Sequence, residues 1–359
     1  MPSPHKQKKT LLLFNLAVDA RDPLLGFTVP LIARIACEME SVHVITVRTG
    51  TFSLPPNVFV YSVGRERGVG KIACVHAFYR HLFFILRGTR IDACFSHMNP
   101  LFTVLASPML FVRRIPIILW YSHRYRGFIV RIAHFFSSRI VTSISEAYTS
   151  SDPKIIITGH MVDTDFFTPL SREIRILPFF LSMGRISPIK DLVTFIRAAA
   201  ILRDKGYAFI CSCVGPVSDC DGGYNAFLRA EIKRLSLQDF FSFVSAVAYE
   251  DTPSYYRSAL VHVNLCATGS LDKATLEAMA CGTVSVFANT AYIPLVGAFS
   301  SNLFFRHADS RDLARIMAGL MDASPQTLCA IRTSLRERIV AYHSMDSFIV
   351  QLCRIVEEL

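Results

Sequence analysis

Several common sequence signatures are missing from this chain of 359 residues, and each absence excludes a class of protein. The ten cysteines form no CxxC pair and no cysteine–histidine spacing typical of zinc sites, so a reduced, cytosolic setting is expected. The apolar stretch LFTVLASPMLFV is too short for a transmembrane span and contains a proline. The N-terminal MPSPHKQKKTLLLFNLAV lacks a small-residue cleavage site, so we interpret it as a basic tail before a first strand.

Positive charge is concentrated in the first half of the chain. Residues 1–170 carry 19 lysines and arginines against 10 acidic residues, whereas residues 171–359 carry 19 against 18. This asymmetry predicts an anionic partner for the first half, either a nucleic acid or a membrane surface. Nucleic acid is the weaker alternative, because no nucleic-acid-binding motif accompanies the charge.

Short apolar runs alternate with amphipathic stretches along the whole chain. This βαβα order predicts parallel sheets with helices on both faces, arranged as two Rossmann-like domains that face each other across a cleft. A polar, proline-flanked passage at 168–178 is the expected linker, which gives domains at 1–170 and 171–340. The expected strands are 10–18, 42–47, 57–63, 92–98, 115–123, 140–144, 154–159, 177–184, 209–215, 241–247, 259–265, 283–288 and 303–307.

Four stretches of the second half place polar and glycine residues where expected strands end. Open α/β sheets bind ligands at the carboxyl ends of their strands. Arginine supplies a planar fork and lysine a point charge, which together suit a diphosphate. Helix N-termini add N–H groups and a partial positive charge, and glycine lets a phosphate come close to the backbone. The stretches are MGRISPIKDL, CVGPVSD, FVSAVAYED and TGSLDKATLEAMACG.

Within these stretches, Arg185 and Lys190 are the candidate diphosphate ligands. Gly269 and Ser270 precede the helix start at which a phosphate would bind. Glu277, one turn into that helix, is placed to reach the hydroxyls of a ribose.

GRISPIKDL and TGSLDKATLEAMACGTVSVFAN resemble the two signature segments of the family-four retaining glycosyltransferases, which have the GT-B fold. VDARDPLLGF, SHMNP, LWYSH and TGHMVDTDFF resemble segments of that family's N-terminal domain. The resemblance implies a nucleotide-sugar donor on the C-terminal domain and a last helix, 341–359, that crosses back to the N-terminal domain.

The same resemblance implies roles for single residues. Arg185 and Lys190 would hold the diphosphate, and His123 would face the donor sugar, which makes these three the expected catalytic residues. Asn99 and Arg124 are expected on the acceptor side. The remaining donor-binding residues implied are Gly26, Gly184, Gly215, Val247, Gly269, Ser270, Leu271, Asp272 and Glu277.

The sequence departs from the family pattern in the loop before the signature helix. The usual first glutamate is Gly269, and the usual phenylalanine and glycine are Leu271 and Asp272. TGSLDK resembles a recurring variant of this loop, in which Asp272 or Ser270 would take over sugar recognition. Met161 and Ser245 stand where the family has glycine.

The resemblance implies a retaining transferase that moves a hexosyl group to a glycan or lipid-linked acceptor in cell-surface polysaccharide or glycolipid synthesis. Such a reaction requires electrostatic stabilisation of the leaving diphosphate rather than a protein nucleophile. No cofactor and no metal are expected, and the DTD at 163–165 is expected to cap the chain locally. A GT-B epimerase, a phosphorylase and a non-catalytic nucleotide-sugar sensor or partner subunit remain alternatives.

Residues 71–87 predict an amphipathic helix on the basic domain. Its expected buried stripe is Ile72, Val75, Tyr79, Leu82 and Leu86, and Phe84 falls opposite, near Arg80 and Arg87. An outward aromatic between arginines fits a peripheral helix at the inner membrane face, although a plain basic surface is an equal alternative. Further basic residues of this half are Arg113, Arg114, Arg124, Arg126 and Arg131.

Overall fold

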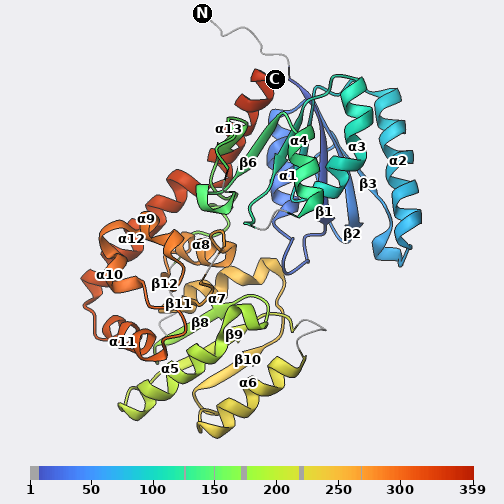
Figure 1. Ribbon diagram of the computed structural model, residues 1–359. Helices are drawn as coiled ribbons and strands as arrows, with labels where there is room; N and C mark the ends of the chain where they lie inside the picture. Colours follow the sequence, from blue (N-terminus) through green and yellow to red (C-terminus); the bar gives the residue numbers. More distant parts are fainter. Residues whose placement is uncertain (1–7, 125–126, 149, 171–175, 218–221, 268) are drawn as a thin grey trace, which may run out of the picture. The chain divides into compact units, whose positions relative to one another are not determined.

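A computed structural model describes the chain apart from residues 1–7, 125–126, 149, 171–175, 218–221 and 268. Arg126 and Thr268 therefore lie outside the described residues. The chain forms two compact α/β units (Figure 1). Unit 1 consists of Met1–Met161 and Met345–Leu359, and unit 2 of Val162–Ser344. The boundary follows Met161, earlier in the chain than the expected boundary after residue 170.

Unit 1 is built on a parallel sheet in the order β3-β2-β1-β4-β5-β6-β7. The interior strand β1 is buried along almost its whole length, which explains why TLLLFNLAV is one apolar run rather than an alternating pattern. The strands are β1 (Thr10–Val18), β2 (Ser41–Thr49), β3 (Val58–Ser62), β4 (Ala93–His97), β5 (Ile117–Trp120), β6 (Arg139–Thr142) and β7 (Ile155–Ile157).

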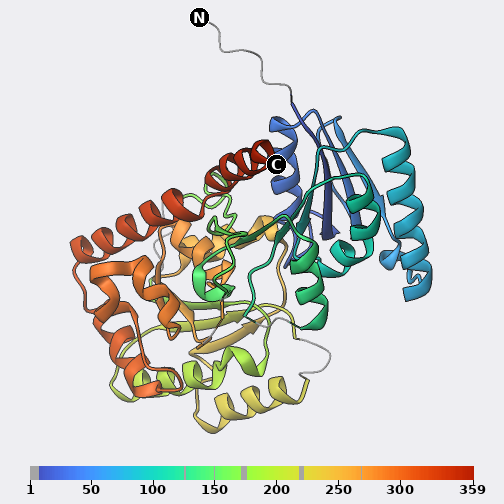
Figure 2. The same ribbon diagram turned by 45° about the horizontal axis from the view of Figure 1, so that its top comes forward.

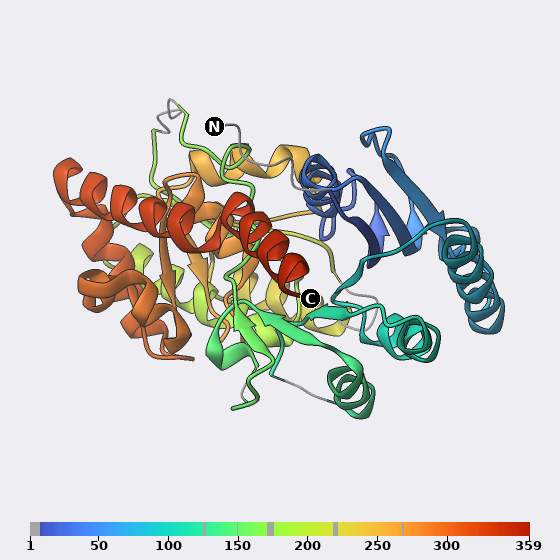
Figure 3. The same cartoon turned by 90° about the horizontal axis from the view of Figure 1, so that it is seen from above.

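Helices cover both faces of this sheet (Figure 3). On one face, Phe78 of α2 (Lys71–Gly88) packs on Phe14 of β1, with ring centroids 5.6 Å apart. On the other face, Phe348 of α13 packs on Phe95 of β4 at 5.9 Å, which confirms that the last helix returns to the N-terminal unit. The other helices are α1 (Thr28–Glu38), α3 (Pro100–Val112) and α4 (Phe128–Phe136), and α13 spans Met345–Glu358; short 3-10 turns are η1 (Arg65–Arg67) and η2 (Ser145–Ala147).

The expected buried stripe of α2 is wrong at its N-terminal end. Ile72 is 88% exposed, and Val75 and Tyr79 are also exposed. The buried residues are Phe78, Leu82, Ile85 and Leu86. No helix in the described part of the chain is long and apolar enough to cross a membrane.

Unit 2 is built on a second parallel sheet, in the order β10-β9-β8-β11-β12. Helix α5 lies between α6 and α11 (Figure 2), and α8 lies beside α7 and α12. The strands are β8 (Phe179–Met183), β9 (Ile210–Val214), β10 (Phe241–Val244), β11 (Val261–Asn264) and β12 (Val284–Phe287). The helices are α5 (Leu192–Asp204), α6 (Gly222–Arg234), α7 (Thr252–Ser258), α8 (Lys273–Ala280), α9 (Ile293–Val296), α10 (Ser300–Leu303), α11 (Ser310–Met321) and α12 (Pro325–His343), with 3-10 turns η3 (Pro188–Lys190), η5 (Tyr249–Asp251), η6 (Thr290–Tyr292) and η7 (Gly297–Phe299).

The expected strand at 303–307 is not formed. Only Phe304 makes an isolated bridge, to Phe287 of β12. Leu303 ends α10, while Leu303 and Phe305 are both buried. The apolar run therefore anchors a loop to the core and does not add a strand to the sheet.

Candidate functional site

The ends of β8 and β9 are pressed together at the carboxyl edge of the unit 2 sheet. The Gly184 N–H donates to the Val214 carbonyl at 2.9 Å. A Cβ at Gly215 would lie 2.0 Å from the Gly184 carbonyl oxygen, and φ at Gly215 is +154°. Only glycine fits at position 215. A Cβ at Gly184 would lie 3.6 Å from the Lys190 Nζ, so the lysine amine lies over this glycine turn.

Lys190 is the cation most firmly held at this edge. It lies in the turn η3 and forms an ion pair with Asp272, which also accepts a hydrogen bond from the Asn264 amide at 3.3 Å. Burial alone would lower the pKa of the Lys190 ammonium, but Asp272 and the nearby Cys266 raise it to about 12. Lys190 is therefore charged at any physiological pH. Arg185 is exposed. It lies close enough to Cys266 for its charge to oppose the rise that burial causes in the pKa of the Cys266 thiol.

The loop from Gly269 leads directly into the N-terminus of α8. Gly269 has φ +106° and open space where a Cβ would be, Ser270 is half-buried and Leu271 is buried. The Asp272 N–H donates to the Tyr292 hydroxyl at 2.6 Å, which fixes the start of the helix. The Asp272 side chain faces Lys190 and Asn264 and does not cap the helix. Since its carboxylate already pairs with a lysine, Asp272 is less suited to the expected role in sugar recognition.

Glu277 lies one turn into α8 and is buried, with 7% of its surface exposed. Its carboxylate accepts a hydrogen bond from the Tyr256 hydroxyl at 3.1 Å. Burial raises its pKa to about 7, although Lys273 and Tyr256 oppose that shift. Burial also lowers the pKa of Lys273 to about 7, against the opposing charges of Glu277 and Asp163.

The other expected donor residue of unit 2, Val247, is half-buried and follows the end of β10. Ser245, two residues earlier, is exposed. Since β10 pairs with β9, these residues lie at the same sheet edge as Gly215.

The expected residues of unit 1 have different environments. His123 and Arg124 are exposed just after β5, and the His123 ring packs edge-on against Tyr121 at 5.6 Å. Gly26 is buried in the turn before α1, and its N–H donates to the Asp22 carbonyl at 2.9 Å. Asn99 is buried, accepts from the Phe102 N–H at 3.2 Å and donates to the Asn15 carbonyl at 3.2 Å. Asn99 thus caps α3, which argues against the acceptor contact that we expected.

Asp163, the first residue of the DTD stretch, has the local role expected from the sequence. Its Oδ1 accepts from the Asp165 N–H at 3.3 Å and the Phe166 N–H at 3.2 Å. Within the described residues, no group of three or more histidine, cysteine, aspartate or glutamate side chains could hold a metal ion. The absence of a metal requirement stays a prediction.

Sequence reasoning missed Lys273, Asn264 and Tyr256, which contact or influence the predicted site residues. Asn264 lies within an expected strand and Lys273 within the loop stretch that follows it, but the sequence does not show which residues contact them. Tyr256 comes from α7 and carries no motif. Only the folded chain brings it to Glu277.

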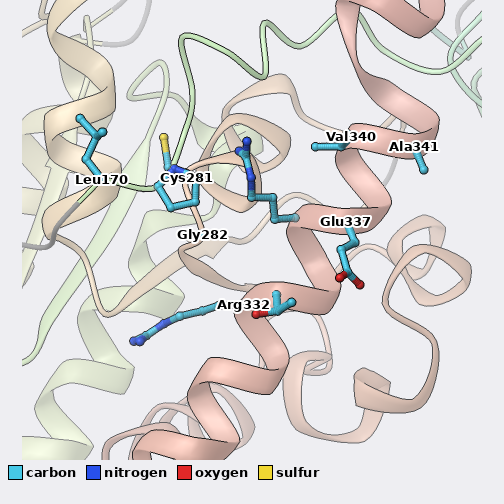
Figure 4. Close-up of a pocket in the computed structure, with 10 residues that line it drawn as sticks. Leu170, Cys281, Gly282, Arg332, Glu337, Val340 and Ala341 are labelled. Carbon is cyan, nitrogen blue, oxygen red and sulfur yellow. The ribbon is translucent and has the colours of Figure 1, made fainter.

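A separate cavity of about 470 Å³ lies near the C-terminal end of α8 (Figure 4). The predicted donor residues lie at the other end of this helix, so the cavity is not part of their site. It is lined by Pro169, Leu170, Cys281, Gly282, Arg332, Thr333, Arg336, Glu337, Val340 and Ala341.

The chain is similar to known proteins in part of its sequence and in its fold. Residues 172–332 match the family model described as Glycosyl transferases group 1. D-inositol 3-phosphate glycosyltransferase 2 of Catenulispora acidiphila is 31% identical over 190 residues, which are 49% of this chain and 44% of that protein. The match therefore spans less than half the length of this curated relative.

Solved structures resemble the whole chain. HepE from Anabaena, in complex with UDP and glucose, has a TM-score of 0.79 at 14% identity and covers 98% of this chain and 100% of its own. Sucrose-phosphate synthase from Thermosynechococcus elongatus has a TM-score of 0.76 at 14% identity and covers 98% and 99%. The chain therefore has the GT-B fold, and its residues 172–332 are similar to the group 1 glycosyl transferases.

Proposed function

We propose that the protein is a glycosyltransferase that binds a nucleotide-diphosphate sugar at the carboxyl edge of the unit 2 sheet. One observation carries this proposal. Four features lie together at that edge, within the segment that matches the family model: Lys190, exposed Arg185, the N-terminus of α8 and buried Glu277. HepE is described in complex with UDP-glucose, which supports a nucleotide-sugar donor.

In the proposed reaction, the bond between the anomeric carbon of the donor sugar and the diphosphate oxygen breaks while the acceptor hydroxyl oxygen attacks that carbon, and the leaving diphosphate takes the hydroxyl proton. Negative charge then builds up on the leaving diphosphate. Arg185, Lys190 and the N–H groups at the start of α8 stabilise that charge, and Glu277 holds the ribose. His123 positions the sugar, and Gly26 lets its loop approach the donor. The base of the nucleotide lies near Gly215 and Val247. The reaction needs no bound metal.

Calorimetric titration with UDP, GDP and ADP tests the donor site. We expect the wild-type protein to bind one of the three, and Arg185→Ala with Lys190→Ala to weaken that binding by about 100-fold or more, because each charged contact contributes about 1.5–3 kcal/mol. Lys205→Ala with Lys233→Ala removes two exposed lysines of the same unit and serves as the control. Absence of binding to all three diphosphates would contradict the proposal.

We further propose that transfer retains the anomeric configuration of a hexosyl group. Proton NMR of the freshly formed product measures this configuration directly, and an inverted product would contradict the proposal. Slow turnover with intact diphosphate binding would instead favour a nucleotide-sugar sensor. That alternative is suggested by Gly269, which has no side chain to contact a sugar.

For the acceptor we propose a lipid-linked glycan at an anionic membrane surface, in cell-surface polysaccharide or glycolipid synthesis. Unit 1 exposes large apolar side chains near arginines on three helices. Phe84 of α2 is 66% exposed, and Phe111 of α3 and Phe128 of α4 are each 77% exposed. Arg113, Arg114 and Arg131 accompany the latter two and are also exposed.

Vesicles containing an anionic phospholipid test this acceptor surface by co-sedimentation. We expect the combined change of Arg80, Phe84 and Arg87 to alanine to reduce binding by about 30-fold or more, because each of the two basic residues near such a surface contributes about 1 kcal/mol. Substitution of exposed Arg229 and Lys233 of unit 2 by alanine provides a control for the loss of two positive charges. Unchanged binding of the triple variant would exclude α2 from the surface.

A further inference from the structure

The cavity near the C-terminal end of α8 is bordered by more apolar residues than polar ones. Its volume of about 470 Å³ lies in the range of pockets that hold small organic molecules. Pro169 and Leu170 border it on one side, and Val340 and Ala341 of α12 border it on another (Figure 4). All of its lining residues belong to unit 2. The cavity is therefore formed within one compact unit and has room for an apolar molecule.

Arg332 of α12 brings an unsatisfied donor to this cavity. The residue is half-buried, and its Nε atom is buried without a hydrogen-bond partner among the described residues. Burial also lowers the pKa of the guanidinium, but an arginine remains charged in a protein. Buried polar atoms are nearly always hydrogen-bonded, so an unpaired donor at the border of a cavity indicates a place for a ligand.

The other charged residues of the cavity leave Arg332 available. Arg336, one turn further along α12, uses its Nη1 and Nη2 groups to donate to backbone carbonyls of α8 and of the chain that enters unit 2. Glu337 is exposed and points away from Arg332 (Figure 4). Two guanidinium groups and one carboxylate line the cavity, so its charge is positive.

We propose that this cavity binds a small organic anion, whose charged group contacts Arg332 and whose apolar part fills the space between Leu170 and Val340. A carboxylate, sulfonate or phosphate group suits Arg332, because a guanidinium donates to such oxygens in a fixed planar geometry. The apolar border favours an organic anion over an inorganic one. The inference does not rest on the proposed function, since the predicted donor residues lie at the other end of α8.

Two dyes that differ in one charged group test this inference. Anilinonaphthalene sulfonate is an anion, and phenylnaphthylamine has the same aromatic body without the sulfonate. Both are titrated by fluorescence into the full chain, with exposed Phe111 and Phe128 of unit 1 replaced by serine because such dyes also bind exposed apolar surface.

In this background we expect Arg332→Met to weaken binding of the sulfonate dye by about 10- to 100-fold, because a hydrogen bond between charged groups is lost. The affinity for the neutral dye should stay unchanged. Arg311→Met, at an exposed arginine of α11, should change neither affinity.

A second variant tests where the dyes bind. Thr333 lines the cavity and is exposed on α12, so Thr333→Trp should fold and should weaken both dyes by reducing the space. Affinities that this change leaves unaltered would place the dyes outside the cavity and overturn the inference. Unchanged binding of the sulfonate dye in Arg332→Met would also overturn it, as would an equal loss of both dyes. If Arg332→Met does not fold, Arg332→Gln is measured against the same criteria.

Discussion

At the scale of single residues, the ends of β8 and β9 depend on the absence of a side chain. Gly215→Ala would place a methyl group 2.0 Å from the Gly184 carbonyl oxygen, so the two strand ends would have to separate. We expect a loss of stability of roughly 2–4 kcal/mol in urea unfolding, together with weaker diphosphate binding.

Gly206→Ala is the matched control for this change. Gly206 also has positive φ, +81°, but nothing lies within 4 Å of its missing Cβ. Its substitution should therefore cost only the backbone strain, on the order of 1 kcal/mol. Equal losses at the two positions would contradict the close approach of β8 and β9.

His262 gives unit 2 a specific sensitivity to acid. Its ring is buried in β11, neither ring nitrogen has a described hydrogen-bond partner, and burial lowers its pKa to about 4. Since the folded pKa lies below the unfolded value of 6.5, the neutral ring contributes stability that is fully present above pH 6.5 and is lost as pH falls towards 4.

We expect His262→Leu to remove this loss, which is on the order of 3 kcal/mol between pH 6.5 and 4. Urea unfolding at a series of pH values measures it. The same change at exposed His76 should leave the acid dependence as in the wild type. An unaltered acid dependence in His262→Leu would show that the His262 ring is protonated at the same pH in the folded and the unfolded protein.

At the scale of whole elements, α12 fastens the C-terminal end of α8 to the chain that enters unit 2. The Arg336 guanidinium donates to the Phe167 carbonyl at 2.9 Å, to the Thr164 carbonyl at 3.3 Å and to the Ala280 carbonyl. Arg336→Met should therefore destabilise unit 2 by about 2–4 kcal/mol. Arg338→Met, two residues along the same helix, removes a single contact of 3.4 Å to Pro294 and should cost less than 1 kcal/mol. A similar loss for both variants in urea unfolding would contradict this role.

The error in α2 shows where helical periodicity fails. Apolar residues occur at so many positions of KIACVHAFYRHLFFILR that several stripes fit a period of 3.6. The buried residues are Phe78, Leu82, Ile85 and Leu86, because these pack in one core cluster with Phe14 of β1 and Phe102 of α3. The sequence pattern does not show which residues of the core will pack on this helix. The helix was therefore predictable, and its buried face was not.

In the whole molecule, the two parallel sheets were predictable because alternating apolar runs and amphipathic stretches favour such a topology, whereas the return of α13 to unit 1 was implied only by the family resemblance. The candidate site was predictable where it follows strand ends, as at Gly184 and Gly215. It was not predictable where it depends on contacts between distant residues. The ion pair of Lys190 with Asp272 joins positions 82 residues apart, and no rule of sequence spacing predicts it.

We expect a nucleotide diphosphate to bind where β8, β9 and β11 end. Hydrogen–deuterium exchange of the full chain, with and without the diphosphate that binds, locates the ligand. Exchange should become slower in peptides covering 184–191 and 269–277 and should stay unchanged in those covering 332–341. Protection of 332–341 without protection at the strand ends would show that the ligand binds elsewhere.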